Sequence, residues 1–151
     1  MKVLLQTVNS ASVKVLNKEI ASISRGYLLL VGFGGGDTKE TVDLMVDKVL
    51  ALRAFADGNR QINLSIKDVN GSILSVSQFT LYANTTKGRR PSFIDALNPR
   101  EAQDLYDYFN SQLEQKHGKV SSGLFGADMD VISSNDGPFT LILDSKELWP
   151  L

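Results

Sequence analysis

The sequence predicts an α+β domain in which a largely antiparallel sheet packs against two long helices. Stretches with strand character dominate both ends of the 151-residue chain, and two stretches with helical periodicity lie between them. The predicted order is strands, helix, hairpin, helix and strands, which is typical of α+β proteins. No internal repeat or linker-like stretch divides the chain, so we expect one domain over residues 1–151.

The first third of the chain is predicted to form successive strands. Residues 3–8 are rich in apolar side chains, and residues 11–16 alternate between apolar and polar ones. Residues 19–23 follow a turn at residues 17–18. Residues 27–33 form a continuous apolar run, which is typical of a strand buried on both faces.

A triple glycine at residues 34–36 follows that run. It lacks the Gly-x4-Gly-Lys-Ser/Thr spacing of a phosphate-binding loop, so we interpret it as a strand-to-helix turn. The first helix is expected to start at Asp37, with Glu40 as its capping-box partner. Apolar side chains at helical spacing then predict a core-facing stripe: Val42, Met45, Val46, Val49 and Leu52.

Four further strands are predicted beyond this helix. Residues 62–66 and 72–81 are expected to pair as a hairpin, because Asn70-Gly71 is a strong turn signal. Strands near residues 129–132 and 139–143 close the chain.

The second helix carries clear start and stop signals. Asn98 is the expected N-cap, Pro99 the first helical residue and Glu101 the residue at N3. His117, the only histidine, lies where this helix should end, and a basic residue there suits the negative end of the helix dipole. This position favours a structural cap over a catalytic role. The predicted buried face comprises Ala102, Leu105, Tyr106, Phe109 and Leu113.

Composition excludes several kinds of chemistry. The chain has no cysteine, which rules out disulfides, thiolate catalysis and cysteine zinc sites. With one histidine in a capping position, the usual general base and the usual catalytic triad are lacking. Any hydrolysis must use hydroxyls, backbone amides, carboxylates or the substrate itself, and we expect no metal and no cofactor.

Charge and hydropathy limit the partners. Lys and Arg total 16 against 17 Asp and Glu, so a nucleic acid would have to bind a local basic patch. No apolar run approaches the roughly 18 residues of a membrane-spanning helix. The N-terminal apolar run meets Gln6 too early for a secretory signal. We therefore expect a cytoplasmic protein without a membrane partner.

The predicted strand over residues 72–81 ends in polar side chains. Along an extended strand, Gln78 and Thr80 would share one face about 6.6 Å apart, at ~3.3 Å per residue. Ser77 and Phe79 would share the other. Such a strand end suits an active site, or simple hydrogen bonding to neighbouring backbone.

Two other segments carry candidate functional groups. The densest basic cluster contains Lys87, Arg89 and Arg90 beside Phe93, which could hold phosphates and stack a base, or form a solvated loop. Gly137-Pro138 lies between two predicted strands, where such a pair usually forms only a turn.

Together these segments resemble a known family. Residues 77–81, Ser-Gln-Phe-Thr-Leu, and residues 135–140, Asn-Asp-Gly-Pro-Phe-Thr, match in order and spacing the two signature motifs of the D-aminoacyl-tRNA deacylases. Four more segments are similar to that family: residues 11–13, 88–93, 105–109 and 123–129. The resemblance covers residues 1 to about 143. It implies a homodimer that hydrolyses the ester between a D-amino acid and the 3′-terminal adenosine of tRNA.

The resemblance also implies site residues. The pocket would be built by Ser77, Gln78, Phe79 and Thr80. Gly137 and Pro138, joined by a cis peptide bond, would enter it from the partner subunit. Their carbonyls would crowd one side of the substrate's Cα, so that L-amino acids are rejected. Glycine, which has no side chain, should pass. Lys87, Arg89 and Arg90 are expected to contact the tRNA backbone, and DNA is not expected as a partner.

Two mechanisms remain open at this point. In one, the adenosine 2′-hydroxyl assists water while backbone amides near Phe79 and Thr80 stabilise the oxyanion. In the other, Thr80 is a nucleophile, although no adjacent base is visible to activate it.

The chain departs from the family pattern in three places. Thr7 stands where the family carries an Arg that is implied to brace the Gly-Pro loop, and Phe139 replaces a more common Val. Residues 144–151 extend past the usual end. A competing interpretation is a catalytically inactive dimeric module of the same fold that binds RNA or another ligand. The intact motifs argue against it, and Thr7 argues slightly for it.

Overall fold

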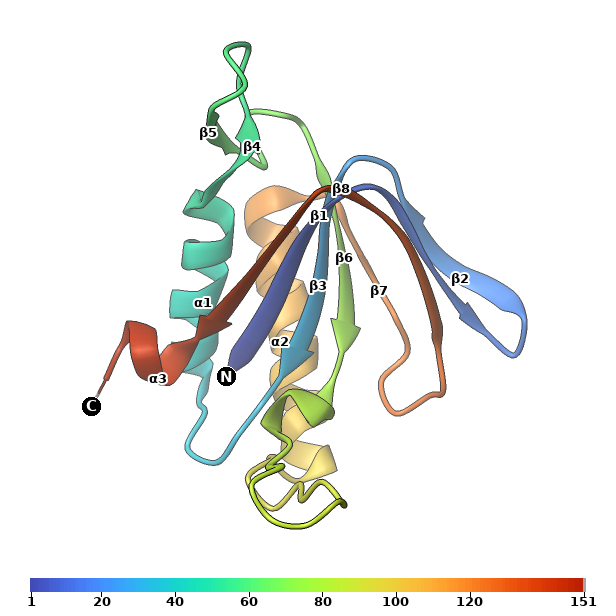
Figure 1. The fold of residues 1–151 in the computed structure, drawn as a ribbon, viewed down its shortest axis with the longest axis vertical. Coiled ribbons are helices and arrows are strands. Elements are labelled where there is room, and N and C mark those ends of the chain that lie inside the picture. The colour runs from blue at the N-terminus through green and yellow to red at the C-terminus, as the bar shows by residue number, and fades with distance from the viewer. Residues whose placement is uncertain (151) are drawn as a thin grey trace.

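A six-stranded sheet carries the other elements in the computed structural model, which describes residues 1–150 (Figure 1). The strand order is β2-β1-β3-β6-β7, and β8 pairs with β1 outside this path. The strands are β1 (Lys2–Val15), β2 (Lys18–Ile23), β3 (Gly26–Gly32), β6 (Ser72–Ser77), β7 (Val120–Ser122) and β8 (Asp130–Asp144).

The sheet is mixed, so the prediction of a largely antiparallel sheet is wrong, whereas the α+β class is confirmed. β1 runs antiparallel to β2, β3 and β8, but β6 runs parallel to both β3 and β7. The chain leaves β3, passes through a helix and a small hairpin, and returns to the same end of the sheet before β6 begins. A crossover of this kind makes the two strands parallel.

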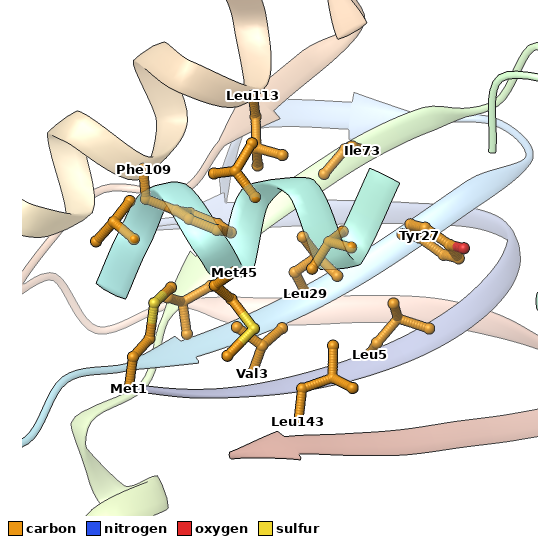
Figure 2. Close-up of a cluster of buried hydrophobic side chains, with 14 of the residues drawn as sticks. Met1, Val3, Leu5, Tyr27, Leu29, Met45, Ile73, Phe109, Leu113 and Leu143 are labelled. Atoms are coloured by element: carbon orange, nitrogen blue, oxygen red, sulfur yellow. The ribbon is translucent and has the colours of Figure 1, made fainter. Parts of the chain in front are cut away.

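Both long helices pack on one face of the sheet (Figure 1). They are α1 (Lys39–Ala51) and α2 (Pro99–His117), and the Tyr108 hydroxyl of α2 donates to Asp43 Oδ1 of α1 over 2.8 Å. Figure 2 shows the core between helices and sheet, to which Met45 and Phe109 contribute from the helices and Leu5 and Leu29 from the strands. This packing confirms the predicted apolar stripes of the two helices.

The first helix begins one residue later than predicted. Thr38 is its N-cap and forms a capping box with Thr41, instead of Asp37 with Glu40. The Asp37 carboxylate is used elsewhere, because it accepts from Gly34 N over 2.7 Å and from the ammonium group of Met1. Asp37 thus ties the glycine turn to the first strand. The second helix begins as predicted, with Asn98 capping Glu101 N over 3.0 Å.

The predicted hairpin through Asn70-Gly71 is wrong. A hairpin joins β4 (Arg53–Ala56) to β5 (Ile62–Ser65), and β5 pairs with β4 rather than with β6. Asn70-Gly71 instead ends a turn over residues 66–71, in which Gly71 N donates to Ile66 O over 2.9 Å. This turn starts β6 beside β3, so the turn signal is real but its partner strand is different.

Several predicted segments join or end differently. The two strands predicted within residues 3–16 form the single strand β1, and those within residues 129–143 form the single strand β8. The tail includes α3 (Ser145–Leu148), and Leu148 and Trp149 pack against the core. No helix within residues 1–150 is long and apolar enough to cross a membrane.

Candidate active site

A pocket of about 600 Å³ lies where β3 and β6 end. Its other walls come from the loop before α2, the first turn of α2 and the loop between β7 and β8. The lining is mainly apolar, and its polar side chains are Ser77 and Gln78 at the end of β6, Asn98 before α2 and Asp128 between β7 and β8. Pockets of this size and character are typical small-molecule sites.

The predicted segment at residues 77–80 forms one edge of this pocket, but not as a strand. β6 ends at Ser77, and a 3-10 turn, η1 (Phe79–Tyr82), follows. Gln78 N donates to Val31 O over 2.7 Å, and Ala83 N then donates to Thr80 O over 3.0 Å. The predicted alternation of side chains therefore stops at Ser77. Ser77, Gln78 and Phe79 line the pocket, whereas Thr80 does not.

Gly32, the last residue of β3, has no side chain that would keep the η1 turn away from the end of this strand. A Cβ at Gly32 would stand 2.8 Å from Gln78 O and 3.2 Å from Leu81 Cβ. Real Cβ atoms essentially never come that close to a backbone oxygen. The missing side chain thus lets the η1 turn close against β3 at the pocket edge.

Thr80 and Gln78 are bonded to each other through their side chains. The Gln78 side-chain amide donates to Thr80 Oγ1. An amide nitrogen that donates a hydrogen bond cannot accept the hydroxyl proton, so Gln78 is not a base for a Thr80 nucleophile.

An aromatic pair stands at the pocket mouth. Phe79 and Phe93 are in edge contact, with ring centroids 5.0 Å apart and planes at 65°. Phe79 is 57% exposed, which is high for so large an apolar side chain in contact with another. The sequence pointed to both residues, but only the fold brings them together.

The basic cluster lies outside the pocket, on the loop that leads to it. Lys87, Arg89 and Arg90 are exposed on the loop between η1 and α2, at the lower end of the molecule in Figure 1. Two backbone bonds between Asn84 and Ser92, of 2.7 and 2.9 Å, close this loop just before Phe93 enters the pocket wall. The cations therefore lie on a closed loop that leads directly into the pocket wall.

Gly137 and Pro138 do not line this pocket of their own chain. Their peptide bond is cis, as expected, and Gly137 has a φ of 121°, which favours glycine. In the β1–β8 ladder Gln6 pairs with Thr140 and Val8 with Asn135, so residues 136–139 bulge opposite one residue. Both residues of the pair are exposed on this bulge.

Thr7 is the residue opposite the bulge. It is buried, and its hydroxyl donates to Asp136 O over 3.0 Å. The loop therefore has a side-chain contact from this position even though the family's arginine is missing.

The remaining predictions concern His117 and ions. His117 is in the last turn of α2, its Nε2 lies 2.7 Å from Gly71 O, and Gly118 follows with a φ of 86°. The structural interpretation of His117 is thus confirmed, since it lies away from the pocket lining. Among residues 1–150, no group of three or more His, Cys, Asp and Glu side chains could hold a metal ion.

Two residues at or behind the pocket were not predicted from the sequence. Asp128 is the ionisable side chain in the pocket lining, and it comes from the loop between β7 and β8. Tyr106 lies behind the pocket, where its hydroxyl donates to Ser75 O of β6 over 2.8 Å. Its phenol pKa is raised, chiefly by burial. Neither role has a local sequence signal, because both depend on packing between distant segments.

The family model and the relatives in sequence agree on one family. The family model described as D-Tyr-tRNA(Tyr) deacylase matches residues 4–144. A D-aminoacyl-tRNA deacylase of Lactobacillus gasseri is 51% identical over 144 residues, which is 95% of this chain and 99% of the relative. One of Clostridium perfringens is 52% identical over 147 residues, or 97% and 99% of the two chains.

Two solved structures are similar in fold. A c-Myc DNA unwinding element binding protein superposes with a TM-score of 0.91 at 38% identity, covering 95% of this chain and 98% of that one. A probable eukaryotic D-amino acid tRNA deacylase superposes with a TM-score of 0.84 at 21% identity, covering 94% and 97%. The second similarity shows the fold alone.

Proposed function

The chain belongs to the D-Tyr-tRNA(Tyr) deacylase family, and we propose on that premise that it hydrolyses the ester of D-aminoacyl-tRNA to free D-amino acid and tRNA. The observation that carries this proposal is the pocket at the end of β6, where the matched motif at residues 77–80 lies. Its volume of about 600 Å³ suits an aminoacyl group together with the terminal adenosine.

Backbone amides and the substrate supply the proposed chemistry. Water attacks the ester carbonyl, an oxyanion forms, and the bond to the adenosine 3′-oxygen then breaks. Phe79 and Thr80 are the first residues of η1, so no earlier carbonyl of that turn accepts from their amides, which remain available to the oxyanion. The alternative, a Thr80 nucleophile, lacks a base, because the Gln78 amide cannot take the proton of the Thr80 hydroxyl. The adenosine 2′-hydroxyl is therefore the group that assists the water.

A second copy of the chain completes the site in this proposal. Gly137 and Pro138 are exposed and lie outside their own pocket, so they are free to enter the pocket of a partner. Within the described residues β8 pairs only with β1, and it exposes Ile132 and Ile142. An unpaired edge strand with exposed apolar side chains is a common dimerisation surface.

Chiral selection follows from a backbone wall. Exchanging L for D swaps the hydrogen and the side chain on Cα, so rigid carbonyls placed on one side admit only one isomer. Such a wall does not recognise the identity of the side chain. Many D-amino acids and glycine should therefore be accepted, while L-amino acids are rejected. A clash with a rigid wall discriminates far better than the loss of one methylene contact.

The tRNA body would bind beside the pocket mouth. Lys87, Arg89 and Arg90 supply the cations for its phosphates, and the loop that carries them continues into the pocket wall. A cytoplasmic location fits this substrate.

The decisive measurement follows ester loss from D-Tyr-tRNA, L-Tyr-tRNA and Gly-tRNA in parallel. We expect rapid loss from the D-ester and the glycyl ester, and little beyond spontaneous hydrolysis from the L-ester. If the protein hydrolyses none of the three esters, the alternative function, a catalytically inactive binding module of the same fold, is favoured. Equal activity on both isomers would overturn the proposed wall.

A further inference from the structure

The end of β6 is held differently on its two edges. On the edge towards β3 the parallel ladder runs to the end of the strand, and Gln78 N then donates to Val31 O over 2.7 Å. On the other edge the ladder with β7 covers only Ile73–Ser75, and Gly123 N donates to Ser75 O over 2.9 Å just past the end of β7. Within residues 1–150, the last two residues of β6 therefore have no strand beside them on this edge.

Tyr106 of α2 occupies this place. It is 2% exposed, and its hydroxyl donates over 2.8 Å to Ser75 O, the oxygen that also accepts from Gly123 N. Burial raises the phenol pKa, and hydrogen bonding to Ser75, the Asn110 side chain and the backbone of Ser77 lowers it in part. The phenol is thus bonded along the free edge of β6, where the next residue of β7 would otherwise pair.

The ring of Tyr106 reaches a second wall of the pocket. Its centroid lies 5.8 Å from that of Phe125, with the planes at 43°, and Phe125 lines the pocket from the loop between β7 and β8. Tyr106 itself lies outside the lining. One side chain of α2 therefore connects the end of β6 with the neighbouring pocket wall from behind.

We propose that Tyr106 is a positioning residue for hydrolysis: its hydroxyl fixes the end of β6, and thereby the backbone amides of Phe79 and Thr80 at the start of η1. The inference rests on the proposed function, in which these amides stabilise the oxyanion. Only Gln78 lies between the end of β6 and η1, so a displacement of the strand end is passed on to both amides. Tyr106 does not touch the substrate.

The test compares Tyr106→Phe with Val49→Ala. Phenylalanine keeps the ring beside Phe125 and removes only the hydroxyl. Val49 is fully buried on α1 and lies outside the pocket lining, so its truncation lowers stability away from the site. We expect Tyr106→Phe to lower the single-turnover rate constant on D-Tyr-tRNA roughly three- to tenfold, the range that corresponds to one lost hydrogen bond, with the half-saturating protein concentration nearly unchanged. Val49→Ala should keep the wild-type rate constant despite a lower Tm.

Hydrogen exchange supplies a readout that does not depend on activity. The Gln78 amide, which is bonded to Val31 O, reports on opening at the end of β6. Relative to the core amides of β3, its exchange should become faster by a similar factor in Tyr106→Phe, and it should not change in Val49→Ala.

The outcomes separate positioning from stability. If the two variants lose activity in proportion to their loss of Tm, or if Tyr106→Phe keeps the wild-type rate constant, the inference is overturned. Inertness of the wild type on D-Tyr-tRNA and Gly-tRNA would instead refute the proposed function. The Gln78 exchange would then still decide whether Tyr106 holds the strand end: faster exchange in Tyr106→Phe would support this role, and a wild-type rate would overturn it.

Discussion

Thr80 is the residue on which the two mechanisms differ. Its side chain is bonded to the Gln78 amide, which cannot remove its proton. We therefore expect Thr80→Ala to retain single-turnover hydrolysis of D-Tyr-tRNA within about tenfold of the wild type, whereas loss of a true nucleophile would cost several orders of magnitude. Mass spectrometry after rapid quenching provides the check, since an aminoacyl group covalently bound to Thr80 would refute substrate assistance.

Two buried tyrosines offer a matched test of hydrogen bonding. The Tyr106 hydroxyl donates to Ser75 O, whereas that of Tyr27 has no partner among the described protein atoms. Tyr106→Phe should therefore lower the free energy of unfolding by about 1–2 kcal/mol, and Tyr27→Phe should leave it unchanged or raise it. Urea unfolding at pH 7 measures both. Equal losses in the two variants would contradict this account, because the bond to Ser75 O would then not explain the loss at Tyr106.

The same pair predicts the alkaline behaviour. Burial raises the phenol pKa of Tyr27 and Tyr106 in the folded state above the usual 10.0. Each phenol therefore ionises first in the unfolded chain. Their contribution to stability is fully present below pH 10 and is lost as the pH rises above it. Either Tyr→Phe variant should show a weaker loss of stability between pH 10 and the onset of alkaline unfolding than the wild type.

At the scale of elements, the closeness of β3 to the η1 turn should control activity. In Gly32→Ala the new Cβ would stand 2.8 Å from Gln78 O and displace the pocket edge. We expect kcat/KM on D-Tyr-tRNA to fall at least about tenfold, in line with the cost of small misplacements at reacting centres. Gly35→Ala is the control, because its Cβ meets nothing within 4 Å. Similar activities for the two variants would contradict this role of Gly32.

The basic loop is the second element with a measurable role. Replacing Lys87, Arg89 and Arg90 together by Ala should weaken tRNA binding and flatten its salt dependence. The slope of log K against log salt concentration should fall by about 2, because each lost phosphate contact removes about 0.7–0.9. Filter binding from low to moderate salt measures it. If the slope does not change, another surface binds the tRNA.

At the scale of the whole molecule, subunit mixing tests where the loop acts. Gly137→Ala disturbs the loop, because Gly137 has a φ of 121°, and Gly32→Ala disturbs the pocket. Each homodimer should be impaired. A mixed dimer should contain one intact pocket facing one intact loop. Random assortment makes half the dimers mixed with one working site of two, so co-refolding should restore about a quarter of wild-type activity.

The control is mixing without refolding, in which the subunits do not exchange and activity should stay low. If co-refolded mixtures also stay inactive, the loop serves the pocket of its own chain or no pocket at all. That outcome would remove the partner subunit from the mechanism.

The sequence by itself determined features that depend on neighbouring residues. The cap at Asn98, the helix end at His117 and the turn at Asn70-Gly71 are local, because propensity and hydrogen bonding act over a few positions. The motif at residues 77–81 and the Gly137-Pro138 pair carried the family resemblance. These features predicted where the pocket edge lies, but not its shape.

Only the tertiary structure decided strand direction and long-range contacts. Periodicity shows which side chains are buried but not which strand lies beside them, so the parallel pairing of β6 with β3 was missed. The contact of Thr7 with Asp136 spans 129 positions and arises because β1 and β8 pair on both sides of the bulge. Such contacts result from the packing of whole elements, whose free energy depends on all of them at once, and no local pattern records it.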